Sequence, residues 1–203
     1  MAAPRIPPGT RRDIGLVNTV IAGLIGAATG SGPPNLFTTL ARHRRLYRPW
    51  LRFAAALMPR GGLPRRDSEL VILRVASNCD CAYELAHHRH LARREGLTDV
   101  QVDAVVRDPV AAGWTPREAA LLAGVDELHE RRTLSDACWT RLAAHLTETQ
   151  LIELPMLVGH YEMLAMTLNS LGVRPDAPPG TPSGIVGRTA YALARACRGR
   201  QHR

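Results

Sequence analysis

Apolar residues recur every three or four positions along most of the chain, which is the spacing of one face of an α-helix. No run of alternating polar and apolar residues is long enough to compete as a β-strand. The sequence therefore predicts an all-α fold, a single-domain helical bundle. The expected helices cover residues 35–43, 48–58, 69–76, 81–95, 98–106, 116–129, 136–142 and 147–171.

Three capping boxes mark helix starts, each a Thr followed three residues later by Glu or Gln, whose side chains bond the first free backbone amides. They begin at Thr98, Thr115 and Thr147, and Pro116 places a proline at a first helical position. Pro155 lies inside the last segment, so we expect it to bend that helix or to delay its start.

The length of 203 residues suits one domain. We divide the chain into an N-terminal amphipathic extension (1–32), a helical domain (33–173) and a Pro/Gly linker with a basic C-terminal tail (174–203), which carries a short helix near residues 188–198. The apolar run over 14–30 is too short and too glycine-rich for a membrane span. We expect it to form a surface helix or an oligomer contact.

Composition narrows the possible functions. The net charge is +8, and all 26 basic residues are arginine. Without lysine there is no Schiff base, which excludes pyridoxal enzymes and lysine aldolases. No phosphate-loop or dinucleotide-binding motif is present. The arginines are spread along the chain, with six in the last thirty residues, and they form no stripe with interleaved aromatic residues, so we expect no specific nucleic-acid binding.

The four cysteines are Cys79, Cys81, Cys138 and Cys197. No pair has the C-x-x-C spacing of a zinc ribbon or a thioredoxin-like motif. A chain of this length does not need a disulfide framework. These points predict a reducing, cytoplasmic setting.

One short segment concentrates side chains that handle protons. On a helix, Cys81, Glu84 and His88 lie within about 60° of one another, so they share a face. The imidazole can act as acid or base near neutral pH, and the carboxyl can orient it or carry a proton itself. A short turn before this helix can bring Glu69 back toward the same face. The plain structural interpretation is a buried cysteine beside a solvated Glu–His pair.

Glu84 and His87 also have the Glu-x-x-His spacing of di-iron bundles. Such sites need a second pair, and no other Glu-x-x-His occurs in the chain. We therefore expect no metal and no cofactor.

The stretch 69–76, followed by Cys81-x-Tyr83-Glu84-x-x-x-His88 and the Ala-Arg-Arg-x-Gly-Leu of 92–97, resembles the superfamily of carboxymuconolactone decarboxylases and alkylhydroperoxidase D-like proteins. Flanking segments around residues 34–41 and 158–173 resemble it too. The resemblance implies an all-α fold and a homo-oligomer whose active pocket lies near a subunit interface.

The peroxidase branch of this superfamily carries Glu…Cys-x-x-Cys-x-x-x-His. By resemblance, Glu69, Cys81 and His88 take three of these places. Glu84 stands where the second cysteine belongs, so the usual disulfide cycle cannot close. The chain thus resembles the branch without C-x-x-C, which implies proton chemistry without a cofactor.

These observations predict a decarboxylase, lyase or isomerase acting on a small carbonyl or carboxylate substrate. Glu69, Cys81, Glu84 and His88 are its expected catalytic residues. Two alternatives remain open: a thiol peroxidase that uses Cys81, with Cys79 or an external thiol resolving it, and a non-catalytic binding or assembly protein on the same fold. The expected substrate-binding residues are Tyr83, His160 and Trp50, with Arg74 or Arg89 as candidates to hold a substrate carboxylate.

Overall fold

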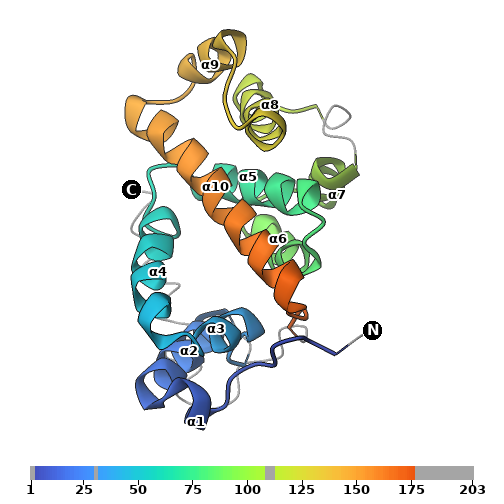
Figure 1. Cartoon of the computed structure of the whole chain (residues 1–203). Coiled ribbons are helices and arrows are strands. Elements are labelled where there is room, and N and C mark those ends of the chain that lie inside the picture. Colours follow the sequence, from blue (N-terminus) through green and yellow to red (C-terminus); the bar gives the residue numbers. More distant parts are fainter. Residues whose placement is uncertain (1–2, 30–31, 108–112, 177–203) are drawn as a thin grey trace. The chain divides into compact units, whose positions relative to one another are not determined.

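The computed structural model describes residues 3–29, 32–107 and 113–176. Within these ranges the chain forms helices and no strand, so the predicted all-α fold is confirmed (Figure 1). The helices are α1 (Arg11–Ile14), α2 (Leu16–Thr29), α3 (Asn35–Leu40), α4 (Arg44–Leu57), α5 (Arg65–Asn78), α6 (Ala82–Arg94), α7 (Asp99–Arg107), α8 (Pro116–Arg131), α9 (Asp136–Ala143) and α10 (Glu148–Leu171).

Contacts divide the chain into two compact units, Met1–Pro49 with Leu171–Arg203, and Trp50–Ser170. Helix α5 is central to the second unit, where it packs against α6, α7 and α8. Its residues from Asp67 to Leu73 are all buried, which is typical of a helix surrounded by others. The core cluster of buried side chains joins these four helices and comprises Leu70, Leu73, Ala92, Leu97, Val102, Val105 and Leu122.

The capping boxes mark helix starts in the structure. Thr115 accepts a hydrogen bond from the Glu118 amide, and the Glu118 carboxylate accepts one from the Thr115 amide at 3.0 Å. Ser135 caps α9 through the amide of Cys138. Helix α10 begins at Glu148, directly after the predicted cap at Thr147.

Helix α10 begins at Glu148 and continues through Pro155, which lies at an exposed position, so the proline does not delay the start of the helix. Helices α4 and α5 begin earlier than predicted. Helix α4 begins at Arg44 rather than near residue 48, with Pro49 inside it. The buried Tyr47 anchors this first turn, and Pro49 removes only one backbone donor. Helix α5 begins at Arg65, immediately after Pro64.

In the first unit, the N-terminal segment is tied to the chain that follows α10. The Arg5 amide donates to the Leu171 carbonyl at 2.9 Å, and the Asn35 amide donates to the Asp176 carboxylate at 2.7 Å. Helix α2 leaves four aliphatic side chains exposed: Leu16, Val17, Val20 and Leu24. No helix in the described ranges is both long and apolar enough to cross a bilayer. The predicted basic helix near residues 188–198 lies outside the described residues.

Candidate functional site

A tight turn between α5 and α6 builds the site. Helix α5 ends at Asn78 with Cys79 as its C-cap, Asp80 adopts a left-handed conformation with φ of 48°, and Cys81 is the N-cap of α6. The Cys81 amide donates to the Ala76 carbonyl at 2.9 Å, which closes the turn. Asp tolerates this backbone region better than most residues. The two helices then pack on each other, so that side chains distant in sequence can meet.

The predicted proton-handling side chains lie inside the protein and not on its surface. Cys81 is 0% exposed, Glu84 3% and His88 6%. The Cys81 thiol and the Glu84 carboxyl lie close enough to influence each other's pKa. This placement excludes the interpretation of a solvated Glu–His pair.

Glu69 reaches His88 from the preceding helix. The Glu69 Oε2 atom lies 2.7 Å from His88 Nδ1, and its Oε1 accepts a hydrogen bond of 2.9 Å from the Arg65 guanidinium. A carboxylate only accepts, so Nδ1 donates to Glu69, and a neutral His88 ring would carry its lone pair on Nε2. The Arg65–Glu69–His88 chain therefore fixes the tautomer and the orientation of the imidazole.

Glu84 is in an unusual environment for a carboxyl group. Neither of its oxygens has a nitrogen or oxygen hydrogen-bond partner within the described part of the chain. Burial raises the pKa of Glu84 to about 8, while the Cys81 thiol acts weakly in the opposite direction. Near neutral pH the group is therefore largely protonated, and it can donate a proton to a bound molecule.

Aromatic side chains of α10 and α4 extend the site. The Tyr161 ring packs edge-on against His88, with centroids 5.2 Å apart. Burial raises the pKa of Tyr161, and the carboxylates of Glu69 and Glu84 raise it further when they are ionised.

His160 continues this aromatic arrangement. Its ring stacks on Trp50 at 6.2 Å, and Phe53 meets it edge-on at 5.3 Å. Burial lowers the pKa of His160 to about 4, and its Nδ1 has no hydrogen-bond partner among the described residues. The ring is therefore neutral and offers one unsatisfied nitrogen close to Tyr161.

The remaining predicted residues are placed differently. Tyr83 is buried, and its ring stacks on the ring of His87. Arg74 forms a two-pronged ion pair with Asp126 at 2.6 and 3.0 Å and is not available to hold a substrate carboxylate, which corrects that expectation. Arg89 keeps one buried guanidinium nitrogen, Nε, without a partner in the described chain.

Both cysteines of the turn are protonated at neutral pH. Burial raises the pKa of Cys81 to about 12, and the backbone amides of Glu84 and Tyr83 only partly offset it. Burial, followed by the charge of Glu162, raises the pKa of Cys79 to about 11. The helix N-terminus therefore does not turn Cys81 into a thiolate.

Sequence reasoning did not assign roles to Arg65, Phe53 or Tyr161. Arg65 precedes Glu69 by four residues, a helical ion-pair spacing that was visible in the sequence. Tyr161 and Phe53 lie on α10 and α4. The approach of these helices to α6 depends on tertiary packing, which no local sequence pattern predicts.

Residues 44–127 match the Carboxymuconolactone decarboxylase family. This interval contains Glu69, Cys81, Glu84 and His88, and ends before His160. No curated protein matches the chain.

Several solved structures are similar at low identity. An alkylhydroperoxidase AhpD core structure, of an uncharacterized peroxidase-related protein from Ralstonia eutropha JMP134, is 20% identical with a TM-score of 0.75, over 96% of this chain and 98% of its own. An uncharacterized peroxidase-related protein from Silicibacter sp. TM1040 is 16% identical with a TM-score of 0.76, over 87% and 96%. The debrominase Bmp8 is 16% identical with a TM-score of 0.67, over 93% and 97%. These identities indicate a shared fold and leave the reaction open.

Proposed function

We propose that this chain is an acid–base enzyme that needs no cofactor. The match of residues 44–127 to the carboxymuconolactone decarboxylase family, which agrees with the sequence motif, and the fold shared with alkylhydroperoxidase D-like proteins support this proposal. It acts as a decarboxylase, lyase or isomerase on a small carbonyl or carboxylate substrate. The observation that carries this proposal is the buried Glu84 carboxyl, which lacks a nitrogen or oxygen partner in the described chain.

The two proton carriers have complementary states. Glu84 is a neutral acid, because its pKa of about 8 lies above neutral pH. Nδ1 of His88 donates to Glu69, so Nε2 is the atom that carries the lone pair in the neutral ring and can take a substrate proton. Pairs of groups whose environments favour opposite protonation states are typical of general acid–base sites.

In an isomerisation, His88 Nε2 takes a proton from the carbon next to a substrate carbonyl. The electron pair of the C–H bond forms an enolate, whose oxygen receives a hydrogen bond or a proton from Glu84. Return of the proton from His88 to a different carbon completes the reaction. In a decarboxylation, the C–C bond to the carboxylate breaks instead, carbon dioxide leaves, and Glu84 protonates the resulting carbanion.

Arg65 and Glu69 act as positioning residues in this scheme. Glu69 is fully buried and holds His88 Nδ1, while Arg65 neutralises the carboxylate from its other oxygen. Tyr161, His160 and Trp50 form the aromatic side of the site, where they exclude water and pack against an apolar substrate body. Exclusion of water strengthens the polar contacts inside the site.

The test is turnover by matched variants. A panel of β-keto acids and unsaturated γ-lactone carboxylates is incubated with the enzyme in D2O, and NMR follows solvent deuterium incorporation and substrate loss. Glu84→Gln and His88→Gln should each reduce the rate by about 10²–10⁴-fold. The controls Glu130→Gln and His90→Gln, both at exposed positions, should leave it unchanged. Full activity in both Glu84→Gln and His88→Gln contradicts the proposal.

A thiol reaction is the second candidate. It is favoured by the position of Cys81 at the N-terminus of α6, and by the neighbour Bmp8, a debrominase whose structure with 2,3,4-tribromopyrrole was determined for a variant with a cysteine replaced by alanine. The raised pKa of Cys81 and of Cys79 weighs against it. Thiol titration after peroxide treatment separates the candidates. Loss of two thiols per chain, reversed by reductant and absent in Cys81→Ser, favours the thiol reaction.

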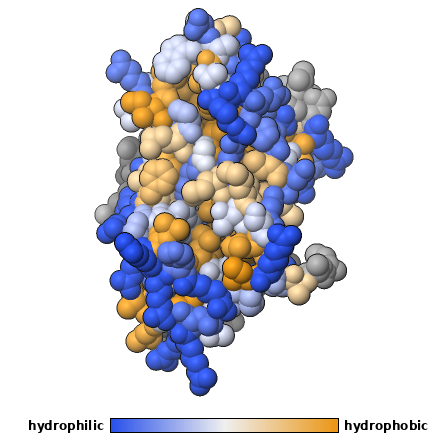
Figure 2. All heavy atoms as spheres, viewed as in Figure 1, coloured by the Kyte–Doolittle hydropathy of each residue, from blue (hydrophilic) through white to orange (hydrophobic). Residues whose placement is uncertain are grey.

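We also propose that α10 contributes to a homo-oligomer, as the resemblance implied. Its exposed face carries Ile152, Met156, Gly159, Met163 and Met166, at intervals of four and three residues and without a charge. Figure 2 shows apolar surface gathered over α10. This spacing matches the seam of two packed helices, and the glycine allows close approach.

A further inference from the structure

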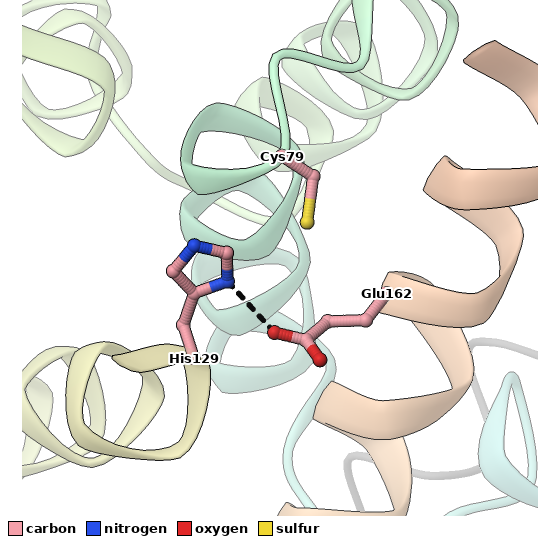
Figure 3. Close-up of side chains that lie close together, drawn as sticks. All are labelled: Cys79, His129 and Glu162. Atoms are coloured by element: carbon pink, nitrogen blue, oxygen red, sulfur yellow. Dashed lines mark hydrogen bonds and ion pairs between the residues drawn. The ribbon is translucent and has the colours of Figure 1, made fainter. Parts of the chain in front are cut away.

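A second cluster of reactive side chains lies outside the acid–base site. Cys79 at the end of α5, His129 in the last turn of α8 and Glu162 in the middle of α10 point toward one another (Figure 3). One potential ligand atom from each residue lies within 4.8 Å of the other two. The His129 Nδ1 and Glu162 Oε1 atoms are already 2.8 Å apart. Three separate helices therefore converge on one point.

The donor set suits a particular class of ion. A thiolate, an imidazole and a carboxylate are all ligands of zinc, and zinc sites with three protein ligands keep a fourth position for water or substrate. The ligand lengths of a tetrahedral zinc site place its donor atoms about 3.3–3.7 Å apart. Side-chain rotations that move each donor by about 1 Å bring the present atoms into that range.

Charged side chains around the three potential ligands include a cation that would compete with a bound metal ion. Burial and the carboxylates of Glu162, Glu84 and Asp80 raise the pKa of the Cys79 thiol, and the Arg132 guanidinium lowers it. Arg132 is bound to the other oxygen of Glu162 and partly neutralises it. The Arg132 side chain is 67% exposed, so it can move into solvent when a cation takes its place.

We propose that Cys79, His129 and Glu162 bind one divalent cation of the zinc class, with a water molecule in the fourth position. The ion replaces the hydrogen bond between His129 Nδ1 and Glu162. The proton on Nδ1 of the His129 ring moves to Nε2. The thiol proton of Cys79 is released to solvent as the thiolate coordinates. The site ties α5, α8 and α10 together within the second unit. It departs from the expectation of no metal, which considered only ligand pairs on one helix.

Cobalt and zinc titrations of the chelator-treated, tag-free full chain test this site. Co²⁺ bound to a cysteine gives a thiolate-to-metal charge-transfer band in the near ultraviolet, which reports the ligand directly. We expect one equivalent of Co²⁺ to produce this band and one equivalent of Zn²⁺ to abolish it. Cys79→Ser should remove the band, and His129→Gln and Glu162→Gln should each weaken Zn²⁺ binding by about 100-fold or more.

The controls separate this site from every other thiol. Cys81→Ser, Cys138→Ser and Cys197→Ser should retain the band, and circular dichroism checks that each variant keeps its helix content. Arg132→Gln removes only the competing cation, so Zn²⁺ should bind about two- to fivefold more tightly. The proposal is overturned if the wild-type chain gives no thiolate band, if the band persists in Cys79→Ser, or if neither Glu162→Gln nor Arg132→Gln alters affinity.

Discussion

Replacement of Glu84 by Gln changes how the stability of the protein depends on pH. In the folded chain the pKa of Glu84 is about 8, compared with an ordinary value of 4.5. Between these values the unfolded chain has lost the proton and the folded chain still holds it. Folding is therefore favoured by this group below pH 4.5, and that contribution is lost as the pH rises through 8.

The size of the effect follows from the same two values. The interval of about 3.5 pH units corresponds to about 5 kcal/mol, since each unit is worth 1.36 kcal/mol. About 4 kcal/mol of this falls between pH 5 and pH 9. Glu84→Gln has no proton to lose. Its free energy of unfolding relative to the wild-type chain should therefore rise by about that amount from pH 5 to pH 9.

Urea denaturation at several pH values between 5 and 9 measures this difference. His160 acts in the opposite direction, because burial lowers its pKa to about 4 and the unfolded chain binds the proton more readily. Its contribution is present in both proteins and cancels in the difference. Parallel stability curves for the wild-type chain and Glu84→Gln would refute the assignment of Glu84 as a neutral buried acid.

Three further predictions address other parts of the molecule. Glu69→Gln removes the buried anion that holds His88 and should lower the free energy of unfolding by about 3–5 kcal/mol at pH 7, as measured by urea denaturation. Thr115→Ala removes the N-cap of α8 opposite Glu118 and should cost about 1 kcal/mol in the same assay. Met163→Glu places a charge in the exposed face of α10 and should shift the mass measured by light scattering to that of the monomer; an unchanged mass contradicts the oligomer contact.

The sequence predicts the start of a helix well where a local motif such as a capping box marks it. Thr115 with Glu118 defined the start of α8 to the residue, because a capping box is made by residues only three positions apart. The start of α4 at Arg44 was not predicted: Pro49 lies inside the helix, and Tyr47 in its first turn is buried. Burial is decided by packing partners that no window of sequence contains.

In the candidate site, too, the sequence predicts what helical spacing determines and not what depends on tertiary packing. Helical spacing predicted that Cys81, Glu84 and His88 share a face, and the structure shows all three buried. The bond from Glu69 to His88 spans 19 residues and depends on how the turn at Asp80 orients α6 against α5. The Cys79, His129 and Glu162 cluster draws on three helices, so only the folded chain brings it together.

Two glutamates at equivalent helix positions show why Glu84 is suited to proton transfer. Glu118 and Glu84 each stand three residues after an N-cap, Thr115 and Cys81 respectively. Glu118 is buried, which raises its pKa. Hydrogen bonds from Thr115 and an ion pair with Arg66 nevertheless lower the pKa below its ordinary value.

Glu84 lacks both of these partners. The Cys81 amide already donates to the Ala76 carbonyl in the tight turn, and the thiol is a poor substitute for the Thr115 hydroxyl. Glu84 therefore lies in the interior without the hydrogen bonds that keep Glu118 ionised, although the helix N-terminus by itself favours an anion at both positions. The turn that joins α5 to α6 thus does more than bring Glu69 to His88, because by occupying the Cys81 amide it also leaves Glu84 as a neutral acid.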